Sequence, residues 1–231
     1  LGIGTTVTAA IQSSDATSAM VIGFINAGVM TIYQGLSIML GAYIGTTVTG
    51  VLASFSSLSV SLYLLLFSFF GTILIFFKNE KIKNIGEILL GLGLLFFGLA
   101  VMKESFKNAD ITNGCQTLFK NIDYGVVLFI LGVLITAIIQ SSSAITSIVI
   151  AMAGGGALGL GSSLYLVLGA TLGTVATTLL SCLGGNVNGK RTAVAAFLMR
   201  LCTSLVTLVI LLIFEDEIVN LLGIFKVQSI L

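Results

Sequence analysis

The stretch IQSSDATSAM, at residues 11–20, places a cluster of polar side chains inside an otherwise apolar chain. A second stretch, IQSSSAITSI, repeats the pattern at residues 139–148, at an offset of 128 residues. Burying hydroxyl and amide groups in an apolar environment costs free energy unless these groups find partners. A sequence that carries the same polar cluster twice is therefore expected to use it.

The composition indicates a membrane protein. Of 231 residues, 57% are hydrophobic and 8% are charged, whereas soluble domains average roughly 25% charged residues. Apolar runs occupy residues 58–77, 85–102, 125–139, 162–183 and 193–214, and a spanning helix needs about 20 such residues. The net charge of +1 gives no reason to expect a nucleic-acid partner. We therefore predict an all-α integral membrane protein.

The polar clusters belong to a longer internal repeat. Residues 4–50 align with residues 132–178 without a gap, and 18 of the 47 aligned positions are identical. Shared leucine and isoleucine could arise from composition alone. Shared polar residues at one fixed offset, such as Gln12 with Gln140 and Thr46 with Thr174, could hardly do so. The chain therefore contains two repeats.

Each polar cluster is expected at the tip of a re-entrant helical hairpin. A straight spanning helix would leave Gln12 and its neighbours unpaired in hydrocarbon, at a cost of several kcal/mol. Two short helices that meet at a break, buried among other helices, avoid that cost. The pattern thus predicts a hairpin that enters the membrane and returns to the same side.

The two repeats are predicted to have inverted topology. Three crossing segments, at residues 33–52, 58–77 and 85–102, separate the hairpins, and an odd number makes the second repeat enter from the opposite side. Inversion places the lysines of residues 78–84 on the side of Lys190 and Arg191, away from the acidic residues 215–217 and the nearly neutral loop at residues 103–123. The positive-inside rule assigns that lysine-rich side to the cytoplasm.

The repeats are expected to occupy residues 1–84 and 85–231. The helix at residues 85–102 precedes the second hairpin, and its counterpart would lie before residue 1. We therefore expect the complete protein to have one further N-terminal helix.

Inverted repeats with broken helices are typical of secondary transporters, whose site lies at mid-membrane on the repeat interface. At a break, the helix N-terminus offers unpaired N–H groups and a partial positive charge to an oxyanion. Exposed carbonyl oxygens and hydroxyl groups suit a hard cation such as sodium. One hairpin tip could thus hold an anion and a cation side by side.

Serine, threonine and glycine also permit close helix packing in membranes, and for any single residue that simpler interpretation is favoured. Two copies of Gln-Ser-Ser, followed by GAYIGTTVT at residues 41–49 and by GATLGTVAT at residues 169–177, favour a binding site instead. The glycines there permit backbone excursions that expose carbonyl oxygens to a cation.

The paired QSS clusters, the G-A-x-[IL]-G-T stretches and the run VIGFINAG, at residues 21–28, resemble the bacterial type II sodium/phosphate cotransporters. The resemblance spans essentially the whole chain. It implies a multi-pass protein of the bacterial inner membrane that couples sodium ions to phosphate uptake, without enzymatic activity or an organic cofactor. Its expected partners are inorganic phosphate, sodium ions, the lipid bilayer and a second copy of the chain as a homodimer.

The resemblance also implies site residues. The predicted phosphate ligands are Gln12, Ser13, Ser14, Asp15, Gln140, Ser141, Ser142 and Ser143. The predicted sodium ligands are Ser14, Thr46, Thr47, Thr49, Ser142, Thr174 and Thr177.

The chain departs from the family pattern at several positions. Asp15 replaces a serine, while Tyr43, Thr171 and Arg200 stand where the family has asparagine. Arg200 is nine residues beyond Arg191, which in a helix is about 13 Å deeper in the bilayer. Intramembrane charges are costly and are usually paired or functional.

Three roles remain open for Arg200. It could compensate Asp15 at the repeat interface, which is the hypothesis we favour, or bind the anion directly in place of one sodium ion's charge. It could also extend to the cytoplasmic interface without a role in transport.

Asp15 also leaves the substrate open, because a carboxylate repels phosphate unless the ligand is protonated or a cation intervenes. The alternative function is sodium-coupled symport of another small anion or solute. A serine hydrolase is disfavoured, because the chain has no histidine to activate a serine. A passive channel is disfavoured because duplicated inverted sites favour alternating access.

Overall fold

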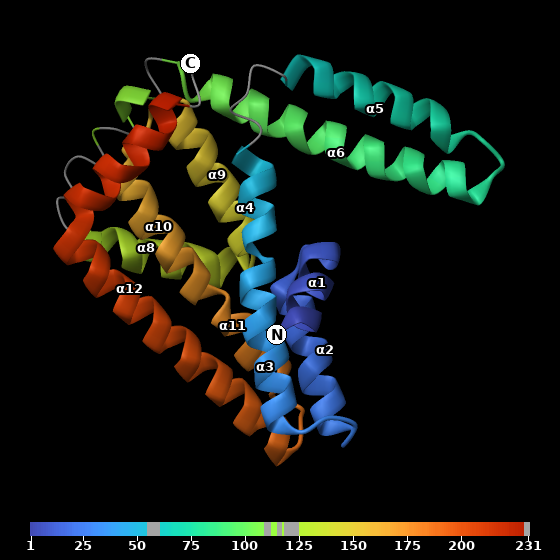
Figure 1. Cartoon of the computed structure of the whole chain (residues 1–231), viewed down its shortest axis with the longest axis vertical. Coiled ribbons are helices and arrows are strands. Elements are labelled where there is room, and N and C mark those ends of the chain that lie inside the picture. Colours follow the sequence, from blue (N-terminus) through green and yellow to red (C-terminus); the bar gives the residue numbers. More distant parts are fainter. Residues whose placement is uncertain (55–60, 109–111, 115–116, 118–124, 229–231) are drawn as a thin grey trace. The chain divides into compact units, whose positions relative to one another are not determined.

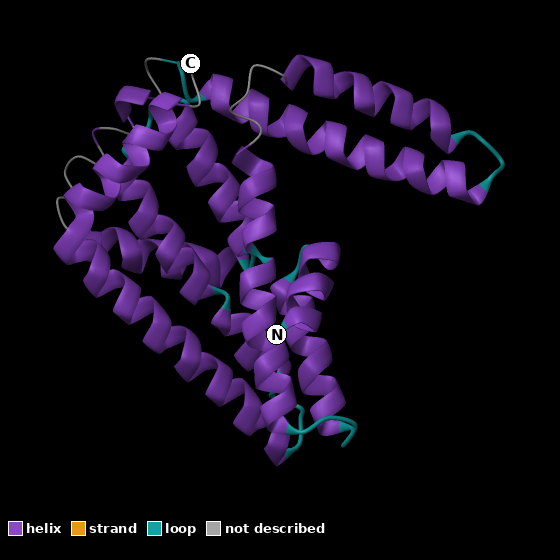
Figure 2. Ribbon diagram, in the orientation of Figure 1, coloured by secondary structure: helices purple, strands orange, loops and turns teal. Residues whose placement is uncertain are grey.

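The structure is a computed structural model that describes residues 1–54, 61–108, 112–114, 117 and 125–228. These residues form helices and no strand, as Figure 2 shows, which confirms the predicted all-α class. In chain order the helices are α1 Gly2–Ile11, α2 Ser14–Asn26, α3 Ile32–Gly45, α4 Thr47–Ser54, α5 Ser61–Ile75, α6 Glu80–Ser105, α8 Gly125–Ile139, α9 Ser142–Gly154, α10 Leu160–Gly173, α11 Val175–Ser181 and α12 Val187–Gln228.

Within the described residues, four helical segments are long and apolar enough to cross a membrane. They are Ile32–Ser54, Glu80–Ser105, Leu160–Ser181 and Val187–Leu222. Large apolar side chains such as Phe69, at 61% exposure, and Ile213, at 65%, cover much of the surface. Such a surface would be unstable in water but suits lipid, so the chain is a multi-pass membrane protein.

Two of the predicted segments extend beyond the described residues. The crossing segment at residues 58–77 begins there, and its described part is α5. Of the loop at residues 103–123, the structure describes residues 103–108, 112–114 and 117.

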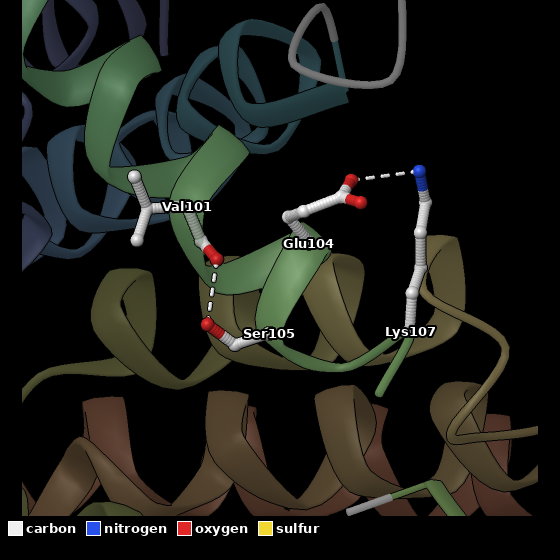
Figure 3. Close-up of polar contacts among 4 residues, drawn as sticks. All are labelled: Val101, Glu104, Ser105 and Lys107. Carbon is white, nitrogen blue, oxygen red and sulfur yellow. Dashed lines mark hydrogen bonds and ion pairs between the residues drawn. The ribbon is translucent and has the colours of Figure 1, made fainter. Parts of the chain in front are cut away.

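The described chain divides into two compact units. The smaller unit, residues 50–118 and 147–158, contains α5 and α6, which lie side by side in Figure 1. Glycines allow this close packing, since a Cβ on Gly86 would lie 2.8 Å from the carbonyl oxygen of Gly71. At the end of α6, shown in Figure 3, the Ser105 hydroxyl donates to the Val101 carbonyl.

Figure 3 also shows the ion pair between Lys107 and Glu104, whose charged atoms are 2.8 Å apart. Both side chains are exposed. An exposed pair of this kind adds at most about 1 kcal/mol of stability, and it joins residues of one segment at the end of α6.

The larger unit comprises residues 1–49, 119–146 and 159–231. In it α1 packs on α3 and α8 packs on α10. A Cβ on Gly45 would lie 2.6 Å from the Thr5 carbonyl oxygen, and a Cβ on Gly173 would lie 2.6 Å from that of Val133. The two contacts involve equivalent positions of the two repeats, because Gly45 and Thr5 lie 128 residues before Gly173 and Val133. The two sequence repeats therefore fold into the same local arrangement.

Helix α12 joins this unit through a small apolar core. Val21, Ile22 and Ile25 of α2 are buried with Met39 of α3, with Cys182 after α11, and with Ala193 and Ala196 of α12. A hydrogen-bonded contact lies nearby, where the Asn186 backbone N–H donates to Asn26 Oδ1 at 3.1 Å and the Asn186 amide donates to the Asn26 carbonyl at 3.1 Å. These contacts fix the end of α2 against the beginning of α12.

Candidate functional site

Both polar clusters lie at breaks between helices. Gln12 follows α1 with φ 59° and ψ 24°, and Gln140 follows α8 with φ 58°. Among the described residues, these are the two that combine positive φ with a side chain beyond glycine. The left-handed conformation costs roughly 1–2 kcal/mol for such a residue, and strain of this kind gathers at functional sites. The predicted break in the helix is confirmed at both positions.

The two breaks are built in the same way. The Gln12 backbone N–H donates to the Thr8 carbonyl at 2.7 Å, and that of Gln140 donates to the Thr136 carbonyl at 2.7 Å. A new helix then starts two residues further on, at Ser14 in α2 and at Ser142 in α9.

A serine caps each of the new helices. Ser13 Oγ accepts from the Ala16 N–H at 3.1 Å, and Ser141 Oγ accepts from the Ala144 N–H at 3.3 Å. The N–H groups of the first turn have no acceptor within their own helix. Each break therefore presents polar N–H groups and the positive end of a helix dipole.

A polar cavity of about 80 Å³ lies where the two breaks meet. Its lining consists of Gln12, Ser13, Ser14, Asp15, Thr46, Gln140, Ser141, Ser142 and Ser143. The structure thus brings together two clusters that are 128 residues apart in the sequence. All eight phosphate ligands that the resemblance predicts line this cavity, whereas Arg200, the further candidate for contact with the anion, does not.

The first repeat supplies three threonines that were predicted to bind sodium. Thr46 lines the cavity, and the Thr49 hydroxyl donates to Gln12 Oε1 at 2.7 Å. Thr47 is exposed, and its hydroxyl donates to the Ile44 carbonyl at 2.7 Å. Thr49 therefore orients the Gln12 side chain, whereas Thr47 does not line the cavity.

The equivalent threonines of the second repeat, Thr174 and Thr177, are not among the residues that line the cavity. Thr174 is buried, and its hydroxyl donates to the Thr171 carbonyl at 2.9 Å. The Thr177 hydroxyl donates to the Thr174 carbonyl at 2.5 Å and also interacts with the Asp15 carboxyl group. Thr177 thus connects the second repeat to the one acidic side chain that lines the cavity.

Arg200 is buried in α12, with 7% of its side chain exposed. Its guanidinium carbon lies 3.9 Å from the centroid of the Tyr43 ring, a distance that allows a cation–π interaction. Arg200 and Asp15 interact electrostatically, but they do not form a direct ion pair in the described part of the chain.

The contact between Tyr43 and Arg200 could not be found from the sequence. Both residues stood out in the sequence, because they stand where the resembling family has asparagine. Their contact depends on how α12 packs on α3, which no local pattern specifies.

The fold and the cavity define a multi-pass membrane protein with a polar cavity at two broken helices. The chain belongs to the Na+/Pi-cotransporter family, which is a family of transporters. The sequence profile of this family matches the chain twice, at residues 1–104 and at residues 101–225.

Two similar proteins illustrate the range of the family. The chain is 28% identical over 189 residues to "Uncharacterized protein YqeW" of Bacillus subtilis, covering 81% of this chain and 61% of that protein. It is 30% identical over 211 residues to "Putative inorganic phosphate export protein YjbB" of Salmonella typhimurium, covering 90% of this chain and 38% of that protein. The chain thus spans less than two thirds of either relative. No solved structure matches it.

Proposed function

We propose that the chain forms the binding core of a secondary transporter that couples sodium ions to the movement of inorganic phosphate. The observation that carries this proposal is the polar cavity that residues of both Gln-Ser-Ser breaks line. Membership of the Na+/Pi-cotransporter family supports phosphate as the substrate and sodium as the coupling ion.

The proposed architecture is a pair of inverted repeats, residues 1–84 and 85–231, each with a re-entrant hairpin, in the inner membrane of a bacterium. The identical breaks at Gln12 and Gln140 support a duplication, as does the double match to one family. In such transporters, one half rocks against the other while the site stays near the middle of the membrane.

Phosphate would bind at the first turns of α2 and α9. Ser14 and Ser142 begin these helices, and the N–H groups there suit the oxygens of an oxyanion. The hydroxyl groups of the cavity and the two glutamine amides add further donors. A cavity of about 80 Å³ has room for an ion of five heavy atoms, because one water needs roughly 10–15 Å³ by the same measure.

Sodium would bind beside the anion, among hydroxyl and carbonyl oxygens. Ser14, Ser142 and Thr46 line the cavity, while Thr49 and Thr177 contact its wall through Gln12 and Asp15. Phosphate beside the Asp15 carboxylate requires a nearby positive charge to offset the repulsion between the two anions.

Two further candidate functions have specific support. YjbB is named for phosphate export, and a carrier of this design runs in either direction according to its gradients, so export is the second candidate. Asp15 in the cavity wall keeps symport of another small anion or solute as the alternative.

Transport by the purified chain in proteoliposomes tests these proposals. Uptake of radiolabelled phosphate should increase under an inward sodium gradient and should fall to background when potassium replaces sodium. Preloaded vesicles with an outward sodium gradient measure export in the same way. Competition by unlabelled sulfate or by organic anions identifies another substrate. Phosphate movement that is indifferent to sodium in both directions would refute the coupling.

Site variants connect transport to the cavity. Ser142→Ala should lower phosphate transport by roughly tenfold, because it removes a donor from a buried charged ligand. Ser37→Ala is the matched control, since Ser37 is exposed on α3 and bonds only the Tyr33 carbonyl at 3.0 Å. Equal transport by the two variants would place the site elsewhere.

A further inference from the structure

Arg200 is a buried charge that the proposed phosphate and sodium ligands do not explain. It has no direct ion pair with Asp15 in the described part of the chain, and it does not line the cavity. A guanidinium group stays protonated in proteins, and leaving a buried charge uncompensated is strongly destabilising. The surroundings of Arg200 must therefore stabilise its positive charge.

Two neighbours of Arg200 connect it to the cavity. Its guanidinium group stacks on Tyr43, which lies on α3 three residues before the cavity-lining Thr46. Its charge also acts on Asp15, the one charged residue in the cavity lining. The positive charge thus acts on the part of the wall that carries the negative charge, although Arg200 does not line the cavity.

We propose that Arg200, held on the Tyr43 ring, is a resident cation of the binding site that balances Asp15 and so replaces one co-transported cation. This inference rests on the proposed function. With Asp15 balanced by Arg200, the cavity carries no uncompensated side-chain charge, and an anion can enter without an extra sodium ion to neutralise the carboxylate.

Tyr43 acts as a positioning residue in this arrangement. The planar guanidinium group stacks on an aromatic face, and such a contact is stronger when it is shielded from solvent. The ring therefore fixes the position of the charge. The equivalent position in the second repeat is Thr171, which has no aromatic ring. Of these two equivalent positions, only Tyr43 can therefore stack on a guanidinium group.

Thermal unfolding of the full chain in detergent tests the charge balance without any ligand. Arg200→Gln and Asp15→Asn should each lower the melting temperature, and the double variant should recover part of the loss. Arg191→Gln, an exposed change on the same helix, should have no effect. Additive effects of the two site variants would overturn the proposal. If Arg200→Gln does not fold alone, folding of the double variant supports the proposal, and its failure overturns it.

Phosphate binding, measured calorimetrically over a series of sodium concentrations, tests the replacement of a cation. Arg200→Gln should weaken phosphate binding by roughly tenfold or more. High sodium should restore this binding, with a sodium Hill coefficient about one higher than in the wild type. Tyr43→Leu should change the phosphate affinity and its sodium dependence in the same direction as Arg200→Gln, by a smaller factor. Tyr33 is an exposed tyrosine of the same helix, and Tyr33→Leu should change neither quantity.

The two measurements separate the inference from the proposed function. A wild-type chain that binds no phosphate refutes the proposed function, while the unfolding cycle still decides whether Arg200 balances Asp15. A wild type that binds phosphate, with Arg200→Gln unchanged in affinity and sodium dependence, overturns the inference alone.

Discussion

Replacing Thr136 by valine is expected to stabilise the protein, although it removes a polar group from a polar region. Thr136 is fully buried in α8, and its hydroxyl has no hydrogen-bond partner among the described residues. The equivalent residue of the first repeat, Thr8, donates to the Thr17 hydroxyl at 2.9 Å. Ile145 stands at the position equivalent to Thr17, so the second repeat lacks the acceptor.

The magnitude follows from this difference. A buried hydroxyl without a partner costs about 1–3 kcal/mol, and valine fills nearly the same volume without that cost. Thr136→Val should therefore raise the free energy of unfolding by about 1 kcal/mol. Thr8→Val breaks a hydrogen bond inside the membrane protein and should lower the free energy of unfolding by roughly 0.6 kcal/mol. One kcal/mol corresponds to a shift of about 2–4 °C in the melting temperature for a chain of this size.

Thermal unfolding in detergent, followed by circular dichroism at one scan rate, measures both variants. The expected result is a higher melting temperature for Thr136→Val and a lower one for Thr8→Val. Ile145→Thr should be tolerated better with Thr136 present than with valine there, because the new hydroxyl gives Thr136 a partner. Equal losses from Thr136→Val and Thr8→Val would show that Thr136 has a partner after all, such as a bound ion, and would refute the reasoning.

Gly45→Ala and Gly173→Ala should each lower the free energy of unfolding by about 1–3 kcal/mol, because the new Cβ would lie 2.6 Å from a carbonyl oxygen of the neighbouring helix. Thermal unfolding measures both, and Gly50→Ala, which meets no atom within 4 Å, should not destabilise the protein. Asn26→Ala removes the acceptor of the Asn186 backbone N–H, so hydrogen exchange of that amide should become several-fold faster. An unchanged exchange rate would show that this contact does not hold the end of α2.

The helix breaks were predictable because they follow from solvation. A cluster such as Gln12 with its serines could not be accommodated in an unbroken apolar helix without unpaired polar groups. The same cluster recurs at Gln140, so its presence in the sequence is not explained by chance. The left-handed backbone at both glutamines was not predictable, because glutamine carries no preference for that conformation. It depends instead on the packing of the surrounding helices.

The choice among neighbouring threonines was also beyond the sequence. Thr46, Thr47 and Thr49 all belong to one polar run, but successive helical residues point about 100° apart. Thr46 lines the cavity while Thr47 faces outward. Which residues face the cavity depends on how α3 ends and α4 begins, at the junction of Gly45 and Thr47, and a motif match cannot determine that rotation.

The positions at which the two repeats agree and differ have separate physical roles. Gln12 and Gln140 are identical and carry the same backbone conformation, so the shared residues build the breaks. Asp15 differs from its equivalent, Ser143, and both line the cavity. A site built from two identical halves would present the same groups to a ligand from each side. With Asp15 on one break and Ser143 on the other, the two sides of this cavity present different groups to a ligand. We infer that the unequal positions, rather than the duplicated motif, determine which ions the site selects.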